Sequence, residues 1–400
     1  MVTTGYEIRA NESFKGRYLD SGDMQMSYFD NAATTQVIPE VFEEIRPYFC
    51  ERYGNPSSIH EMGSEAAAGM RAARERVAKA LNCYPSEITF TSGGTESDNI
   101  ALMGVVGKRG RDRIVTSAIE HSAIIETCDH ARRMGFKASI VPVDREGFID
   151  MSALDSAMGD DVAVLSVMTA NNVIGTLQDL RELSKIAHEH GALFHTDAVQ
   201  GFTKVDIDVR RDGIDMLSLS GHKVHAPKGT GALFVKGGTE ISPIMFGGGQ
   251  ERGLRSSTEN VPGIVGLGKA TEILMSNFDR DVKHMTRLRD RIIDSVLEIE
   301  GSALNGPRHD RLCNNTHFRF EGVKGTELVI KLSGKGIAAS TASACSASDN
   351  EPSHVLSAIG LNADQALSSL RLTLSGLNTD EDVDRLLSVL PETIKECRSQ

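Results

Sequence analysis

The chain has 400 residues, enough to bury a large core and to form more than one domain. Its formal net charge of −12 argues against broad electrostatic binding to nucleic acid or to an anionic membrane. The sequence contains neither an apolar run long enough to cross a membrane nor an apolar signal segment near its start. These features predict a cytoplasmic protein with no nucleic-acid or membrane partner.

The six cysteines are scattered and form no C-x-x-C pair. This spacing argues against a structural zinc site and against a disulfide framework. We therefore expect no metal site.

Short apolar runs alternate with helical patterns through the first two thirds of the chain. Strands separated by helices predict an α/β fold, with a mostly parallel sheet and helices on both faces. The predicted helices end near residues 106, 134 and 190. The predicted strands cover residues 88–91, 113–116, 140–143, 162–167, 192–196, 215–219 and 231–235.

The pattern becomes rich in helices after about residue 270, and residues 275–300 read as one long helix. We expect a large cofactor-binding domain over residues 29–272. A small α+β domain is expected to combine residues 273–400 with residues 1–28, which include a partly ordered extension.

Polar side chains follow three of the predicted strands, at the edge where α/β sheets bind ligands. They are Asn171-Asn172, Asp197 with Gln200, and the turn Ser220-Gly221-His222-Lys223. Taken singly, these are explained by a turn, a helix cap and a lysine just beyond a strand. Their convergence on one edge favours a ligand site, in which a desolvated lysine can form a Schiff base with a carbonyl group.

A glycine-rich turn, residues 92–97, lies between a predicted strand and a helix. A helix N-terminus of this kind can bind a phosphate group, although an isolated example is usually an ordinary turn. It matches neither a Walker loop nor a dinucleotide fingerprint. A phosphate site, a lysine and a carboxylate together suggest pyridoxal phosphate. His121 follows another predicted strand, where it can stack on the cofactor ring and move protons.

These motifs resemble those of the cysteine desulfurases, in the class V aminotransferase group of pyridoxal-phosphate enzymes of fold type I. The resemblance runs from about residue 28 to residue 380 and matches the longer-loop type of desulfurase. It covers residues 28–35, 54–58, 92–99, 120–121, 171–172, 195–200, 220–223 and 247–252.

The resemblance implies a role for each matched position. Lys223 would form the Schiff base, and Asp197 would pair with the ring nitrogen. Arg371 would bind the substrate carboxylate, a task suited to a bidentate guanidinium. The remaining contacts would come from Gln200 at the ring hydroxyl, Asn172 at that hydroxyl or at the substrate carboxylate, and Gly94, Thr95, Ser220 and His222 at the phosphate.

One matched segment implies a homodimer. Thr258 corresponds to a residue that reaches the phosphate site of the partner subunit. The preceding residue, Ser257, stands where the family usually has glycine. Without the resemblance, Arg371 would be interpreted as an ordinary surface residue on an edge strand and not as a substrate-binding residue.

Cys345 lies in a run of small polar residues, where we expect a mobile loop near residues 339–350. The resemblance implies that it takes sulfur from L-cysteine as a persulfide and releases L-alanine, with His121 assisting proton transfer. The sulfur would pass to an acceptor such as an iron–sulfur scaffold protein. The alternatives are a selenocysteine lyase, a pyridoxal-phosphate aminotransferase, or an inactive sulfur-transfer partner.

Overall fold

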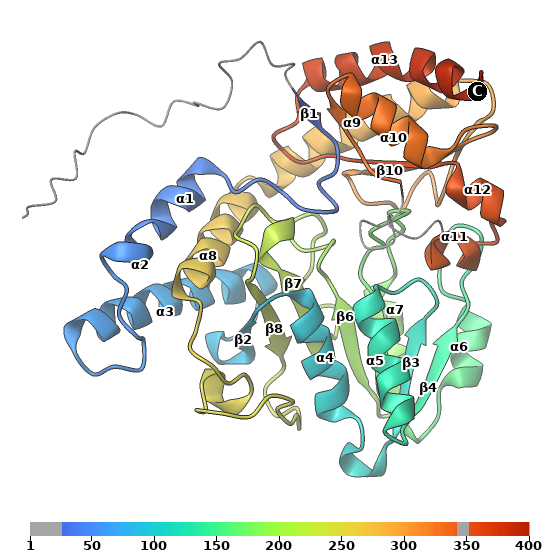
Figure 1. Ribbon diagram of the computed structural model, residues 1–400. Helices are drawn as coiled ribbons and strands as arrows, with labels where there is room; N and C mark the ends of the chain where they lie inside the picture. The colour runs from blue at the N-terminus through green and yellow to red at the C-terminus, as the bar shows by residue number, and fades with distance from the viewer. Residues whose placement is uncertain (1–25, 342–351, 400) are drawn as a thin grey trace, which may run out of the picture.

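The structure, a computed structural model, describes residues 26–341 and 352–399 (Figure 1). These residues form a mixed seven-stranded sheet in the order β2-β8-β7-β6-β5-β3-β4. Strands β3 to β7 run parallel to one another, whereas β8 runs antiparallel to β2 and β7. The bounds are β2 Ile88–Thr91, β3 Arg113–Ser117, β4 Lys137–Val141, β5 Val162–Ser166, β6 Leu193–Asp197, β7 Met216–Ser220 and β8 Gly231–Val235.

Helices cover both faces of this sheet, which confirms the predicted fold class. Successive side chains of a strand point to opposite faces, so Val164 packs with α4 and α5, while Leu165 joins the core beneath α3 and α8. The helices around the sheet are α1 Pro39–Ile45, α2 Pro47–Cys50, α3 Glu61–Leu81, α4 Gly94–Val105, α5 Ser122–Arg133, α6 Met151–Ala157, α7 Leu180–Glu189 and α8 Val261–Ser276. Short 3-10 turns are η1 Pro85–Glu87, η2 Lys108–Gly110, η3 Gly221–Lys223 and η4 Glu251–Gly253.

The C-terminal part forms a second core around a three-stranded antiparallel sheet, ordered β12-β10-β9. The two-residue strand β1 pairs with β11 and ties the start of the described chain to this part. The bounds are β1 Ser27–Tyr28, α9 Phe278–Leu297, β9 Ser302–Leu304, β10 Asn315–Phe320, α10 Gly325–Gly334, β11 Ile337–Ala338, α11 His354–Ala358, α12 Ala363–Leu367, β12 Ser369–Thr373 and α13 Asp380–Arg398.

Two sequence predictions differ from the structure. The single helix expected over residues 275–300 is present as α9, Phe278–Leu297, but it starts later than expected, because Asn277 separates it from α8. Its backbone leaves helical geometry at φ −113° and ψ 9°, and its side-chain amide donates to the Ile273 carbonyl. The strand expected at residues 140–143 is β4, which starts at Lys137, because the chain pairs with β3 from that residue onward.

Among the described residues, no helix combines the length and the apolar character needed to cross a membrane.

Candidate functional site

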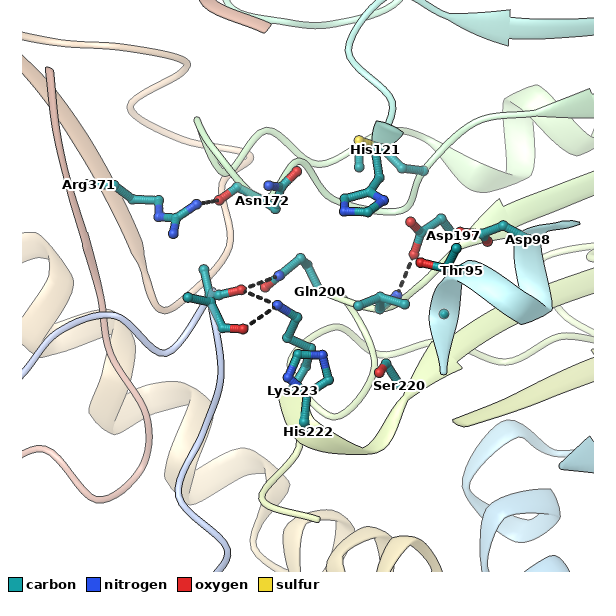
Figure 2. A pocket seen from close by; sticks show the side chains of 15 residues that line it. Thr95, Asp98, His121, Asn172, Asp197, Gln200, Ser220, His222, Lys223 and Arg371 are labelled. Atoms are coloured by element: carbon teal, nitrogen blue, oxygen red, sulfur yellow. Dashed lines mark hydrogen bonds between the residues drawn. The ribbon is translucent and has the colours of Figure 1, made fainter. Parts of the chain in front are cut away.

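A cavity of about 290 Å³ lies at the carboxyl ends of the central strands, between the large sheet and β12 (Figure 2). The fold brings most of the predicted site residues to it from separate elements, because parallel strands end at the same edge of a sheet. The predicted residues in its lining are Gly94, Thr95, His121, Asn172, Asp197, Gln200, Ser220, His222, Lys223 and Arg371.

Lys223 projects into the cavity from η3, the turn that follows β7. Its Nζ atom donates to the carbonyl oxygens of Ala32, at 2.6 Å, and Ala33, at 2.7 Å. The turn is tight: a Cβ added to Gly221 would lie 3.1 Å from the carbonyl oxygens of Pro227 and Thr230. The chain that follows β1 and the chain that follows β7 therefore fix the amine together.

Asp197 ends β6 and is 5% exposed. Its Oδ1 atom accepts a hydrogen bond from the backbone N–H of Val199 at 2.8 Å. Burial raises the pKa of Asp197, and His121 and Lys223 oppose that rise. Gln200 lies beside it and donates through Nε2 to the Ala32 carbonyl at 3.0 Å. The cavity wall therefore carries the carboxyl group of Asp197 close to the amine of Lys223.

His121 caps the start of α5, where its Nδ1 atom accepts from the Ala123 N–H at 3.1 Å. Burial lowers the pKa of His121, so the imidazole is neutral and carries its proton on Nε2. In Figure 2 the ring lies across the cavity from Lys223. The cavity thus has one neutral proton carrier facing one amine.

The start of α4 forms the end of the cavity near Ser220. Helical N–H groups without intrahelical partners face outward at such an end and favour an anion. Gly94 is required there, because an added Cβ would lie 2.6 Å from Val199 Cγ2. His222 is held by Thr34 Oγ1 at 3.2 Å, and burial lowers its pKa to about 4.

Arg371 lies on β12 and is 1% exposed, although β12 is an edge strand. The alternative of a surface arginine is therefore wrong. Its guanidinium donates to Asp30 Oδ1 at 2.9 Å and to the Asn172 carbonyl at 3.1 Å. These contacts place a buried cation at the cavity wall.

Among the described residues, one predicted site residue, Thr258, does not line this cavity. Thr258 lines a separate cavity of about 100 Å³, together with Ser92 and Arg255. The preceding Ser257 has φ +100°, a conformation that favours glycine. Cys345 lies outside the described residues.

Asp98 also lines the cavity, and although it lies in the matched segment 92–99, the sequence assigned it no role. It follows Gly94 by four residues on α4, so the two residues lie on one helix face. That spacing was the available signal.

The sequence matches the aminotransferase class-V family over residues 27–386. It is 47% identical, over 93% of each chain, to the cysteine desulfurase IscS of Methanosarcina thermophila. It is 46% identical to the cysteine desulfurase IscS of Clostridium botulinum, over 93% of this chain and 95% of that protein. A solved structure described as a NifS-like protein superposes with a TM-score of 0.87 at 39% identity, covering 93% of this chain and all of that one.

Proposed function

This chain is a cysteine desulfurase of the aminotransferase class-V family, and we propose that its main cavity holds pyridoxal phosphate beside Lys223. The observation that carries the proposal is the joint lining of one cavity by Lys223, Asp197 and the glycine-rich start of α4. The residues fit the cofactor: a helix N-terminus suits its phosphate, a buried carboxylate suits its ring nitrogen, and a lysine suits its aldehyde carbon.

Pyridoxal phosphate, when bound, withdraws electrons and makes the carbon that carries the substrate amino group acidic. Lys223 would hold the cofactor and would then move the proton of that carbon at Nζ. Asp197 would accept a hydrogen bond from the ring N–H, and Gln200 would bind the ring hydroxyl. The phosphate would be held by Gly94, Thr95, Ser220 and His222.

L-Cysteine is the proposed substrate, and its carboxylate binds Arg371. Asn172 lies beside that arginine, as its backbone carbonyl accepts a hydrogen bond from the guanidinium at 3.1 Å. His121 holds a proton on Nε2, facing the amine of Lys223. It is proposed to pass this proton to the part of the substrate that is released as alanine. Aminotransferase chemistry would need a keto-acid acceptor, whereas desulfuration releases alanine without one.

Cys345 is the proposed sulfur acceptor. Its thiolate attacks the substrate sulfur, an S–S bond forms, and the electrons of the broken C–S bond remain on the carbon that becomes the alanine methyl group. The described flanks of this segment support the assignment. Ser340 pairs with Arg371 through the Arg371 N–H at 2.7 Å, and the His354 ring contacts the Glu120 carbonyl at 2.9 Å, next to His121.

The test adds L-cysteine to the wild type, Lys223→Ala, Cys345→Ala and the control Cys50→Ala, and follows alanine and sulfide. Lys223→Ala is expected to lose the visible cofactor absorbance and turnover. Cys345→Ala is expected to keep the absorbance and release no alanine. The exposed Cys50 is a second thiol away from the cavity lining, so its variant should behave like the wild type. Wild-type turnover by Cys345→Ala would show that the sulfur acceptor is another group.

We also propose that the active form is a homodimer. Large apolar side chains are exposed on the segment from α1 to the start of α3, including Phe49 at 60% and Ile59 at 102%, and Phe246 is 82% exposed. Thr258 lines a cavity separate from the main one, which is consistent with its proposed reach into the phosphate site of a second subunit. Sedimentation equilibrium tests this, and a monomer that retains full activity would contradict it.

The persulfide sulfur is proposed to pass to an acceptor protein such as an iron–sulfur scaffold, in the cytoplasm. All cysteines among the described residues are free thiols, which supports a reducing compartment. Labelled sulfur from cysteine should appear on a purified scaffold only when Cys345 is intact.

A further inference from the structure

Two buried carboxyl groups near the cavity have no role in the proposed chemistry. Asp98 lies on α4 and is 1% exposed, and Glu120 lies in the turn between β3 and α5 and is fully buried. Figure 2 shows Asp98 next to Asp197 at the edge of the cavity. Asp98, Glu120 and Asp197 are all buried, and the charges of Asp197 and Glu120 both act on Asp98. Like charges that interact in a buried setting disfavour one another's ionisation.

Asp98 has no cationic partner in the described part of the chain. Its Oδ1 atom is buried without a hydrogen bond, and the basic nitrogen beside it is His195 Nε2, at 3.8 Å. His195 is bound by Ser166 Oγ at 2.8 Å and by Ser218 Oγ at 3.0 Å, and burial lowers its pKa to about 3. Asp98 therefore faces a neutral imidazole.

Asp197 has the stabilising neighbours that Asp98 lacks. It accepts the Val199 N–H, and the charge of Lys223 favours its charged form. Burial raises the pKa of Asp98 well above its ordinary value, and the charge of Asp197 raises it further, against a smaller opposing effect of Ser218. Of the two neighbouring acids, Asp197 is the one that can stay ionised.

Glu120 is the third acid near Asp98. Ser117 Oγ donates to it at 2.5 Å, and the Met168 N–H contacts both of its oxygens. Burial raises the pKa of Glu120 to about 8, so it is mostly protonated at neutral pH. The groups that face Asp98 are thus Asp197 and His195 from β6 and Glu120 from the turn after β3.

We propose that Asp98 is a positioning residue that stays protonated at neutral pH, so that the cavity wall carries one buried negative charge, on Asp197. This inference rests on the proposed function, in which Asp197 pairs with the cofactor ring nitrogen. If Asp98 were ionised, repulsion would drive a proton onto Asp197 and weaken its grip on a protonated ring. The neutral neighbour keeps the charge where the cofactor needs it.

The first experiment compares the unfolding of full-length wild type and Asp98→Asn, both freed of cofactor, from about pH 5 to pH 8. The folded wild type holds a proton that the unfolded chain loses above its ordinary pKa of about 3.9. The wild type is therefore destabilised as pH rises towards the folded-state pKa, and asparagine removes that cost. The ratio of the unfolding constants, wild type over variant, is expected to grow about tenfold per pH unit.

Asp212→Asn is the matched control, because Asp212 is similarly buried but paired with arginines. The ratio of unfolding constants, wild type over Asp212→Asn, should stay below one and constant from pH 5 to pH 8, because Asp212 is ionised in both the folded and the unfolded chain over this range. A constant ratio for Asp98→Asn across the pH range would overturn the proposal, since a group that only fills space has no such pH profile.

The second experiment uses the holoenzyme and does not depend on how Asp98→Asn folds. Infrared spectroscopy at neutral pH detects the carbonyl stretch of protonated carboxylic acids. Glu120→Gln is expected to keep one such band, from Asp98, and loss of every band would overturn the proposal. Cofactor absorbance, recorded on the same samples, reports separately whether the proposed cofactor site is intact.

Discussion

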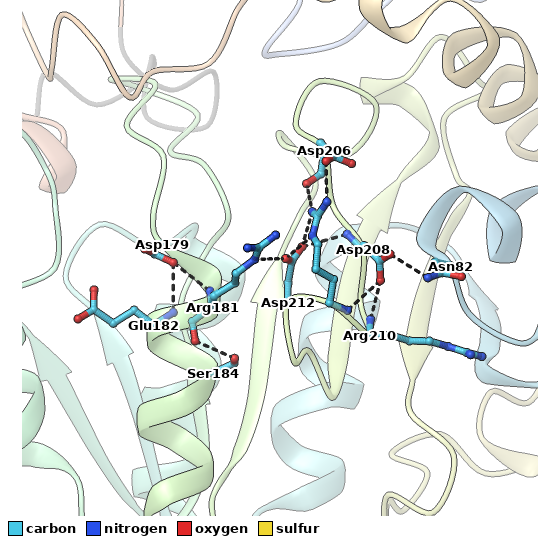
Figure 3. A network of polar contacts seen from close by, with 10 residues as sticks. Asn82, Asp179, Arg181, Glu182, Ser184, Asp206, Asp208, Arg210 and Asp212 are labelled. Carbon is cyan, nitrogen blue, oxygen red and sulfur yellow. Dashed lines mark hydrogen bonds and ion pairs between the residues drawn. The ribbon is translucent and has the colours of Figure 1, made fainter.

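Asp98 and Asp212 are buried almost equally, at 1% and 5% exposure, yet their surroundings give them opposite charge states. Asp212 accepts from Arg181 Nε at 2.8 Å and from Arg211 Nε at 2.8 Å, and its other oxygen accepts the Asp208 N–H (Figure 3). Burial tends to raise the pKa of Asp212, but the arginines outweigh it and the pKa is lowered. Partners, more than burial, therefore decide whether a buried carboxyl is charged.

The two regions also differ in what the acids do. The acids around Asp212 lie in the connection between β6 and β7. Within it, Asp208 accepts a hydrogen bond at 2.8 Å from the side-chain amide of Asn82, the residue with left-handed backbone geometry that ends α3. Asp179 caps α7 in the same network through the N–H groups of Arg181 and Glu182. The paired acids of this network link secondary-structure elements by hydrogen bonds. The acids at the cavity are proposed instead to leave a single ionised carboxylate, that of Asp197, for binding the cofactor.

The largest expected effect tests the charged member of the cavity. Asp197→Asn replaces the anion with a neutral amide of the same shape, and turnover should fall about 10³-fold, in the range of losses caused by removing one preorganised electrostatic contact. Alanine release measures this loss. The variant should unfold no more readily than the wild type, because burial opposes the charge that it removes. Turnover within tenfold of wild type would show that Asp197 does not anchor the ring.

A smaller effect is expected for the paired acid. Asp212→Asn should destabilise the fold by about 1–2 kcal/mol at pH 7, a value reduced because Arg181 is largely exposed to solvent. The pKa of Asp212 is lowered in the folded state, so its contribution is present above the unfolded value, about 3.9, and is lost as pH falls through the folded value. Urea unfolding at pH 7 and pH 3 measures it. An unchanged difference at pH 3 would contradict the pairing.

Backbone strain offers a comparison without charge. Ser257 has φ +100°, so Ser257→Gly should stabilise the fold by about 0.5–1 kcal/mol. The neighbouring Ser256 is buried and has no positive φ, so Ser256→Gly should destabilise it instead. Thermal unfolding of the two variants decides between strain and a general effect of glycine.

The smallest expected effect separates pairing from burial. Asp206 binds the same Arg211 as Asp212 does, at 2.6 Å, but its side chain is 75% exposed. Asp206→Asn should change the stability by less than about 0.5 kcal/mol, as is common for solvent-screened pairs. A cost equal to that of Asp212→Asn would mean that pairing alone, without burial, sets the energy.

Much of the fold and of the candidate site followed from local patterns. Alternating strands and helices predicted the mostly parallel sheet, and the polar residues after β5, β6 and β7 do line one cavity. The patterns misplaced two element starts: that of α9, where the backbone of Asn277 leaves helical geometry, and that of β4, where pairing with β3 begins at Lys137. No role was predicted for Asp98, because a polar residue in a helix looks like an ordinary exposed one.

The sequence by itself determined which groups could meet, because parallel strands carry their C-terminal residues to one edge whatever the rest of the chain does. It placed Lys223, Asp197 and the start of α4 together in this way. Only the tertiary structure decided their charges and orientation. Arg371 meets Asp30 across 341 positions, and Asp98 meets Asp197 from another element. Charge depends on burial and on neighbours brought from far along the chain, which no local pattern records.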